Sequence, residues 1–246
     1  MGYSFEEELN RQLVRGIEGG YNRYAIERST KRQELRVSSA YAWVRGNHID
    51  DQVSREVEDM GLDYQPAKAG YTWSYLQFII PRLKSLLLIK NTTVIKGRKP
   101  AYQLDINQAD NYLVNLSRIN SNINFDELKT EFQGTLKFDE IVPQNSLQDE
   151  QRKLEADFER FYMVTYAVDS ESKMLSKVSL WMPEFKQGST VEMVEIDDLS
   201  RHLGHTGIEF DKDAISALAQ EPESEFSGEA EEYGYSVASI EEEKNG

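Results

Sequence analysis

The chain has 246 residues, enough for one large domain or two small ones, and its 39% hydrophobic and 11% aromatic content is typical of a globular protein. It contains no cysteine, which excludes disulfides, thiol catalysis and thiolate metal sites. No apolar run is long enough to span a bilayer and the first residues are acidic, unlike a signal peptide, so the sequence predicts a soluble cytoplasmic protein.

The net charge of −15 is unevenly distributed. Residues 220–246 contain nine glutamates and one lysine, and this composition predicts a disordered acidic tail. Two other segments are basic: 21–45 has six Lys or Arg against two Glu, and 82–99 has six against none. Such asymmetry bears on partners rather than on fold.

Helices are expected to open the chain. Apolar residues at helical spacing begin at Leu9, after a capping box formed by Ser4 and Glu7, and Gly19-Gly20 is expected to end this first helix. A second helix is predicted over 38–60, with Gly61 just beyond its end. Gly46 could break it.

Strands follow, because aromatic and β-branched residues alternate between turn residues. In the first half they are predicted at 62–65, 72–80, 86–95 and 101–104, with helices at 107–120 and 125–132. In the second half the pattern gives a strand at 135–142, a charged helix at 146–160, a hairpin of 162–168 and 174–182 around a polar turn, a strand at 191–196, and short helices after Asp197 and Asp213.

These elements predict an α+β protein with a mixed sheet and flanking helices in the first half and an antiparallel hairpin sheet in the second. The expected regions are 1–133, 134–219 and the tail 220–246.

No strong catalytic motif is present: phosphate-binding loops, dinucleotide fingerprints, the nucleophile elbow and the zinc-protease motif are all missing, and no cofactor is predicted. His48 lies beside Asp50 and Asp51, a set that could hold a cation. Adjacent helical positions diverge by about 100°, however, so a half-buried helical histidine is the simpler interpretation. His202 and His205 resemble a metal pair only loosely, so no metal site is predicted.

The order of elements over 38–91, a helix followed by three strands, resembles the core of the restriction-endonuclease-like PD-(D/E)XK family. That resemblance implies an acid two residues before Lys90, where this chain has Leu88. A metal cannot be held without the carboxylate, so the resemblance implies an inactive relative that keeps the fold.

Aromatic and basic residues around the same strands could form a nucleic-acid surface, because single-strand binders combine aromatic platforms with cationic grooves. The candidate contacts are Tyr71, Trp73, Tyr75, Arg82, Lys84, Lys90, Lys96, Arg98 and Lys99. Alternating aromatics on a strand are equally what an ordinary core face needs.

The acidic tail carries Phe226, Tyr233 and Tyr235, which a purely solubilising tail does not need and which could bind a protein with a basic surface. The stretches Ala69-Gly70-Tyr71-Thr72-Trp73 and Leu88-Ile89-Lys90-Asn91 resemble uncharacterised proteins of Gram-positive chromosomes and mobile elements. The sequence favours a non-enzymatic regulatory or protein-interaction protein, of toxin–antitoxin or phage-defence type. The alternative is a nucleic-acid-binding protein or degenerate nuclease that uses the basic segments.

Overall fold

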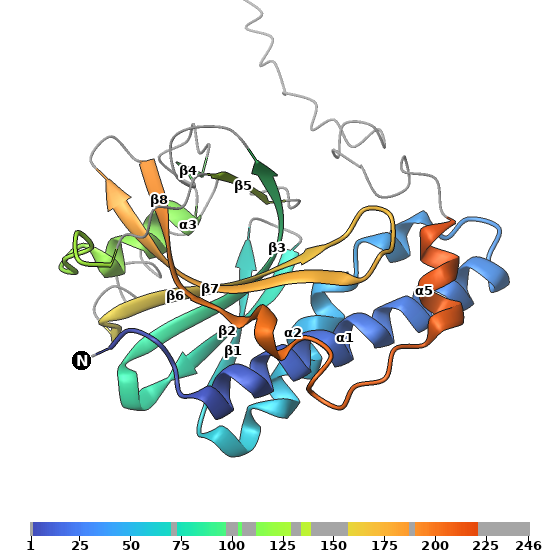
Figure 1. Cartoon of the computed structure of the whole chain (residues 1–246), viewed down its shortest axis with the longest axis horizontal. Coiled ribbons are helices and arrows are strands. Elements are labelled where there is room, and N and C mark those ends of the chain that lie inside the picture. Colours follow the sequence, from blue (N-terminus) through green and yellow to red (C-terminus); the bar gives the residue numbers. More distant parts are fainter. Residues whose placement is uncertain are drawn as a thin grey trace, which may run out of the picture.

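A computed structural model describes residues 2–69, 73–96, 103–104, 112–128, 134–138, 157–186 and 190–220. Two long elements, α1 (Glu7–Glu34) and α2 (Arg45–Glu56), lie together below a large sheet (Figure 1). The shorter helices are η1 (Ser39–Ala42), η2 (Glu58–Met60), η3 (Pro81–Leu83), α3 (Tyr112–Ser117), η4 (Arg118–Asn120), η5 (Leu199–His202) and α5 (Lys212–Ala219).

The strands are β1 (Asp63–Ala69), β2 (Trp73–Ile80), β3 (Ser85–Lys96), β4 (Gln103–Leu104), β5 (Gly134–Phe138), β6 (Arg160–Val168), β7 (Leu175–Lys186) and β8 (Thr190–Asp198). They form one sheet in the order β1-β2-β3-β6-β7-β8-β4. All these neighbours are antiparallel except β3 and β6, which are parallel. The last part of β3 changes partner and pairs with β5.

The α+β class predicted from the sequence is confirmed. Strands from both predicted regions belong to the same sheet, because β3 of the first region pairs directly with β6 of the second. The boundary that the sequence predicts near residue 133 therefore separates, along the chain, strands that belong to one sheet.

Side chains alternate between the two faces of the sheet, as strand geometry requires. One face packs on α1 and α2, and β3 contributes Leu87 and Ile89 to this larger core. The other face forms a second core with α3, to which β3 contributes Leu86 and Leu88. β3 is thus buried on both sides where it is apolar.

The first helix differs from its prediction at both ends. Ser4 does not cap it: Glu6 occupies the cap position, without a side-chain hydrogen bond. Gly19-Gly20 does not end it either, because α1 continues to Glu34. These glycines lie where α1 meets α2, and a Cβ added at Gly20 would lie only 2.5 Å from Cα of Ile49. The glycine is there for close helix packing and not for termination.

The predicted second helix over 38–60 is divided into η1, α2 and η2. Gly61 follows with φ of 71°, the left-handed conformation expected of a residue after a helix. The predicted helix at 107–120 is present over its described part, as α3 and η4. Residues 125–128 form a turn and not the start of a helix.

The hairpin of the second half is confirmed as β6 and β7, and the following strand as β8. The turn is closed by Asp169, whose backbone N–H donates to Met174 O at 2.8 Å and whose carboxylate accepts from Ser172. η5 follows Asp198, and α5 is capped by Asp211, two residues before the expected position. The predicted helix at 146–160 lies almost wholly outside the described residues.

Truncation after Ala219 is expected to shift the thermal midpoint by no more than a few degrees. The apolar residues of α5, Ala214, Ile215 and Leu218, complete the larger core before the acidic tail begins. The tail composition offers little apolar area to bury. Calorimetry of the full and truncated chains checks this, and loss of a cooperative transition on truncation would show that the tail belongs to the core.

Candidate functional site

A band of mostly polar side chains crosses the face of the sheet that also carries the second core. We call it the polar band; it consists of Gln65, Tyr75, Gln77, Lys90, Thr165, Lys177, Ser179, Trp181 and Glu195. It exists because the strands change from apolar to polar at the same level: Leu88 is followed two residues later by Lys90, and Met163 by Thr165. Register then places Thr165 beside both Lys90 and Ser179.

Lys90 is the centre of the polar band. Its side chain is only 4% exposed, and Nζ lies 4.8 Å from the ring centroid of Tyr75. Gln77 Nε2 donates to the Tyr75 hydroxyl at 3.2 Å, and Gln65 Nε2 donates to Gln77 Oε1 at 2.9 Å. Burial of an ammonium group is costly unless its surroundings compensate, and the ring of Tyr75 contributes to that compensation.

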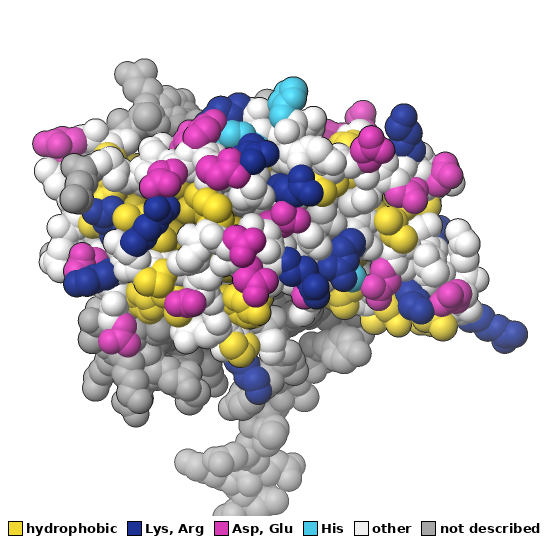
Figure 2. All heavy atoms as spheres, turned by 90° about the horizontal axis from the view of Figure 1, so that it is seen from below, with side chains coloured by type: hydrophobic (Ala, Val, Ile, Leu, Met, Phe, Trp, Pro, Cys, Tyr) yellow, Lys and Arg dark blue, Asp and Glu magenta, His cyan; other side chains and the backbone are white. Residues whose placement is uncertain are grey.

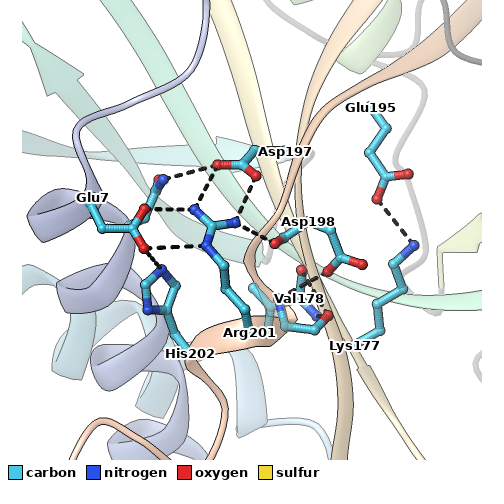
Figure 3. A network of polar contacts seen from close by, with 10 residues as sticks. Glu7, Lys177, Val178, Glu195, Asp197, Asp198, Arg201 and His202 are labelled. Carbon is cyan, nitrogen blue, oxygen red and sulfur yellow. Dashed lines mark hydrogen bonds and ion pairs between the residues drawn. The ribbon is translucent and has the colours of Figure 1, made fainter.

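The other half of the polar band belongs to β6, β7 and β8. Trp181 Nε1 donates to Thr165 Oγ1 at 2.7 Å. Lys177 Nζ lies 3.1 Å from Glu195 Oε1, an ion pair drawn at the right of Figure 3. The Ser179 hydroxyl is buried and makes no hydrogen bond with the residues that the structure describes. Hydroxyls and ammonium groups on one face can hold an anion, whereas a divalent cation needs several carboxylate oxygens.

Leu88 stands where the sequence resemblance to the PD-(D/E)XK family would require the metal-holding acid, and its surroundings are apolar. Leu88 is fully buried in the second core. Within the described ranges, no group of three or more His, Asp or Glu residues is placed to hold a metal ion.

The candidate nucleic-acid contacts that the structure describes lie in different places on the fold. Arg82 and Lys84 lie in the turn before β3, where each is exposed and ion-paired, with Glu6 at 2.8 Å and with Glu159 at 2.6 Å. Lys96 is at the opposite end of β3, a 12-residue strand whose extended length is about 36 Å. Lys90, between them, is buried.

The other residues of that set are less defined. Trp73 begins β2, where its backbone pairs with Ala69. Tyr71, Arg98 and Lys99 lie outside the described residues, as do the tail residues Phe226, Tyr233 and Tyr235.

The two metal candidates of α2, His48 and Asp51, contact different partners. His48 Nε2 lies 3.3 Å from Glu27 Oε2 on α1. Asp51 instead pairs with Arg23 at 2.8 Å and with Arg55 at 3.2 Å, and hydrogen bonds from Arg55 and Arg23 hold its pKa below its ordinary value despite some burial. An aspartate held by two guanidinium groups is a poor metal ligand, so this pair serves helix packing.

His48 is expected to make stability depend on pH. Burial lowers its pKa below the ordinary value of 6.5, against the attraction of Glu27 and Asp51 and with help from Arg23. The unfolded chain therefore takes up the proton first, so the free energy of unfolding falls as pH drops from about 6.5 through the lower folded-state pKa. Urea denaturation between about pH 7 and pH 5 should show a shallower slope for His48→Gln than for the parent chain. Equal slopes would contradict this role.

A second polar network ties the start of α1 to the end of β8 (Figure 3). Arg201 of η5 bonds Asp197 at 2.7 Å and Glu7 at 2.7 Å, and His202 Nε2 lies 3.3 Å from Glu7 Oε1. Hydrogen bonding from Arg201 lowers the pKa of Glu7, and the same contacts raise the pKa of Arg201. His205 donates its backbone N–H to His202 O. We interpret this network as a contact that holds η5 against α1, because the carboxylates of Glu7 and Asp197 both pair with the guanidinium group of Arg201.

Exposed hydrophobic side chains near the end of α1 are a further feature, which the sequence does not predict. Leu35 and Val37, just beyond the last residue of α1, are 42% and 81% exposed, and with Arg36 between them they form what we call the helical end. Ile26, 41% exposed, lies nine residues earlier on α1. The helical end projects beyond the sheet in Figure 1, and basic and hydrophobic side chains are visible at the corresponding end of Figure 2. Tyr64, on β1, is the other large hydrophobic residue that is exposed in the described chain, at 53%.

No family model, curated protein or solved structure matches this chain. In the portion of the chain that the structure covers, no helix has both the length and the apolar character needed to cross a bilayer.

Proposed function

We propose that this protein is a non-enzymatic regulatory protein that acts by binding another protein through the helical end. The observation that carries the proposal is exposure: two of the four large exposed hydrophobic side chains of the described chain, Leu35 and Val37, flank Arg36 just beyond α1. Clustered apolar surface beside arginine is typical of protein interfaces, whereas single exposed apolar residues are ordinary.

Charge supports a protein partner over a nucleic acid. The net charge of −15 repels a polyanion at long range. Positive and negative side chains are interleaved over the face seen in Figure 2, and both cations before β3 are already paired with glutamates. The acidic tail adds the expectation that the partner also presents a basic surface. We propose a cytoplasmic location because the sequence contains no cysteine, and a toxin–antitoxin or phage-defence setting because catalytic motifs are missing and the acidic tail carries aromatic residues.

Affinity purification from the native host tests the proposal, with the co-purifying material scored as protein or nucleic acid. The tagged parent chain is expected to retain a protein partner in stoichiometric amount. Leu35→Asp/Val37→Asp should lose it, because an aspartate cannot be desolvated in an apolar interface at low cost. Tyr64→Asp, which changes the exposed hydrophobic residue on β1, is the matched control and should keep the partner.

Recovery of nucleic acid alone, or equal recovery of the protein partner by the helical-end variant, would contradict the proposal. Thermal midpoints of all three chains should agree within a few degrees, since the substituted side chains are exposed.

A second candidate function is the binding of an anion, such as a nucleic-acid phosphate, at the polar band. The specific observation in its favour is that the buried Ser179 hydroxyl, which has no hydrogen-bond partner among the described residues, lies on the same face as Lys90, with Thr165 between them. If phosphates bind there, single-strand affinity should fall with salt by a log–log slope of roughly −0.7 per phosphate neutralised, and Lys90→Met should reduce that slope by about one phosphate.

We expect instead negligible oligonucleotide affinity at physiological salt, and no cleavage of DNA or RNA with Mg²⁺ or Mn²⁺. Leu88 supplies no oxygen to a metal at the position where the nuclease family requires one. A sub-micromolar, salt-sensitive complex lost in Lys90→Met, or cleavage lost in Lys90→Ala, would favour this second function.

A further inference from the structure

β1 forms an edge of the sheet that is open to solvent. It is the first strand in the sheet order, and among the described strands its one neighbour is β2. Asp63, Tyr64, Pro66 and Lys68 are exposed along it. An edge strand presents unpaired backbone N–H and C=O groups, and a strand of a second molecule can pair with them. Seven residues are enough for such pairing, whereas β4, at the other end of the order, has only two.

The register with β2 shows which backbone groups of β1 face outward. In an antiparallel pair, opposed residues alternate between exchanging both backbone hydrogen bonds and exchanging none. Pro66 lies opposite Leu76, and the N–H of Leu76 donates to Asp50 Oδ2 at 2.9 Å instead of to β1. This pair therefore exchanges no hydrogen bond. The backbone groups of Pro66, and those of Tyr64 and Lys68 two residues to either side, point away from β2.

Proline interrupts this outward row of donors at its centre. Tyr64 and Lys68 each present an N–H group, but Pro66 has none, because its nitrogen is closed in the ring. The two remaining donors are four residues apart, which is about 13 Å along a strand. Proline occurs in sheets mainly on edge strands with its nitrogen toward solvent, and Pro66 has this arrangement. The charge of Lys68 on the same edge also disfavours a flanking strand.

We propose that Pro66 closes the edge of β1 to strand addition by a second copy of this chain. Apart from Pro66 and the charges of Asp63 and Lys68, the strand is suited to pairing, since Tyr64 is an aromatic residue typical of strands and is 53% exposed. Two β1 edges related by a two-fold axis would meet through the same backbone groups. Pro66 thus prevents the sheet of one copy from continuing into the next, which is a route to aggregation.

Amide exchange of the parent chain tests the orientation of the edge. The N–H groups of Tyr64 and Lys68 are expected to exchange about 100-fold faster than those of Gln65 and Ala67, which the register turns toward β2. Comparable protection of all four amides would show that the edge is already covered, and the proposal would then be wrong.

Pro66→Thr supplies the missing donor and is expected to associate. Sedimentation should show a monomer–dimer equilibrium with a dissociation constant on the order of 0.1–1 mM, which the parent chain lacks. The amides of Tyr64 and Lys68 should gain protection as the concentration of this variant rises. Ala67→Thr is the matched control: it introduces the same β-branched residue one position along, where the N–H already faces β2, so it should associate no more than the parent chain.

Equal masses of the Pro66→Thr variant and the parent chain up to about 1 mM, or equal association of the two threonine variants, would overturn the proposal. A dimer of Pro66→Thr in which the Tyr64 and Lys68 amides stay unprotected would also contradict it, because association would then use another surface. Thermal midpoints of both variants should lie within a few degrees of the parent value, since neither position is buried. Only the purified chain is used, so these results do not depend on whether purification finds a partner.

Discussion

Gly20→Ala is expected to destabilise the protein by about 2–3 kcal/mol, even though alanine is the better helix former by about 1 kcal/mol. A Cβ at Gly20 would lie 2.5 Å from Cα of Ile49 and 2.7 Å from the carbonyl oxygen of His48. Both are backbone atoms of α2, so no side-chain rotation can relieve the contact. The two helices would have to separate, and the apolar layer between them would lose its close packing.

Two glycines of the same chain are matched controls for Gly20→Ala. Gly46 lies in α2 with nothing within 4 Å of an added Cβ, so Gly46→Ala should be neutral or stabilising by up to about 1 kcal/mol. A Cβ at Gly19 would contact Gln52 Cγ at 3.0 Å, and that flexible side chain can move, so Gly19→Ala should fall between the two. Urea denaturation measures all three; equal stability of the Gly20 and Gly46 variants would contradict the packing argument.

Asn120→Ala should cost at least about 3 kcal/mol, because the asparagine satisfies three buried backbone groups at once. Its Nδ2 donates to Phe161 O at 2.8 Å and to Pro183 O at 2.9 Å, and its Oδ1 accepts from Phe161 N at 2.8 Å. Each buried backbone group left without a partner costs about 1–3 kcal/mol. The side chain joins η4 to β6 and β7, so its loss also loosens the second core.

Asn120→Asp refines this prediction, since it keeps the acceptor and removes the donor. It would place a carboxylate oxygen against two carbonyl oxygens and should be about as destabilising as alanine. Asn124→Ala is the control: Asn124 is exposed and accepts one bond, from Asp126 N at 3.2 Å, so its loss should cost less than about 1 kcal/mol. A small effect of Asn120→Ala in thermal or urea unfolding would show that water replaces these bonds.

The hairpin and β8 were predictable because their signals are local. Alternating residues on either side of a polar turn define the register of β6 and β7, and Asp169 is a typical turn residue. The parallel pairing of β3 with β6 was not predictable, since two strands buried on both faces carry no period that identifies a distant partner.

The end of the first helix was predicted wrongly because a glycine has two uses. It can end a helix, or it can admit another backbone at close range. Gly16 and Gly20 lie four residues apart on one face of α1, and a Cβ at either would lie within 2.6 Å of a Cα atom of α2. That spacing is a signal for close helix crossing, whereas Gly19-Gly20 taken by itself predicts helix termination.

The candidate sites differ in how far the sequence could reveal them. Lys90 is predicted from the sequence as a nucleic-acid contact, yet the four apolar residues before it, Leu86 to Ile89, already indicate a strand buried on both faces. The helical end had no comparable signal. Exposure of Leu35 and Val37 depends on which elements fail to cover them, and that is a property of the tertiary structure alone.

Photo-cross-linking from position 37 in the native host tests the central claim most directly. With benzoylphenylalanine in place of Val37, the account predicts an adduct to one partner protein, which the same group in place of Tyr64 should not give. No protein adduct at position 37, an adduct to nucleic acid, or the same adducts from both positions would contradict the assignment of the helical end as a protein-binding surface.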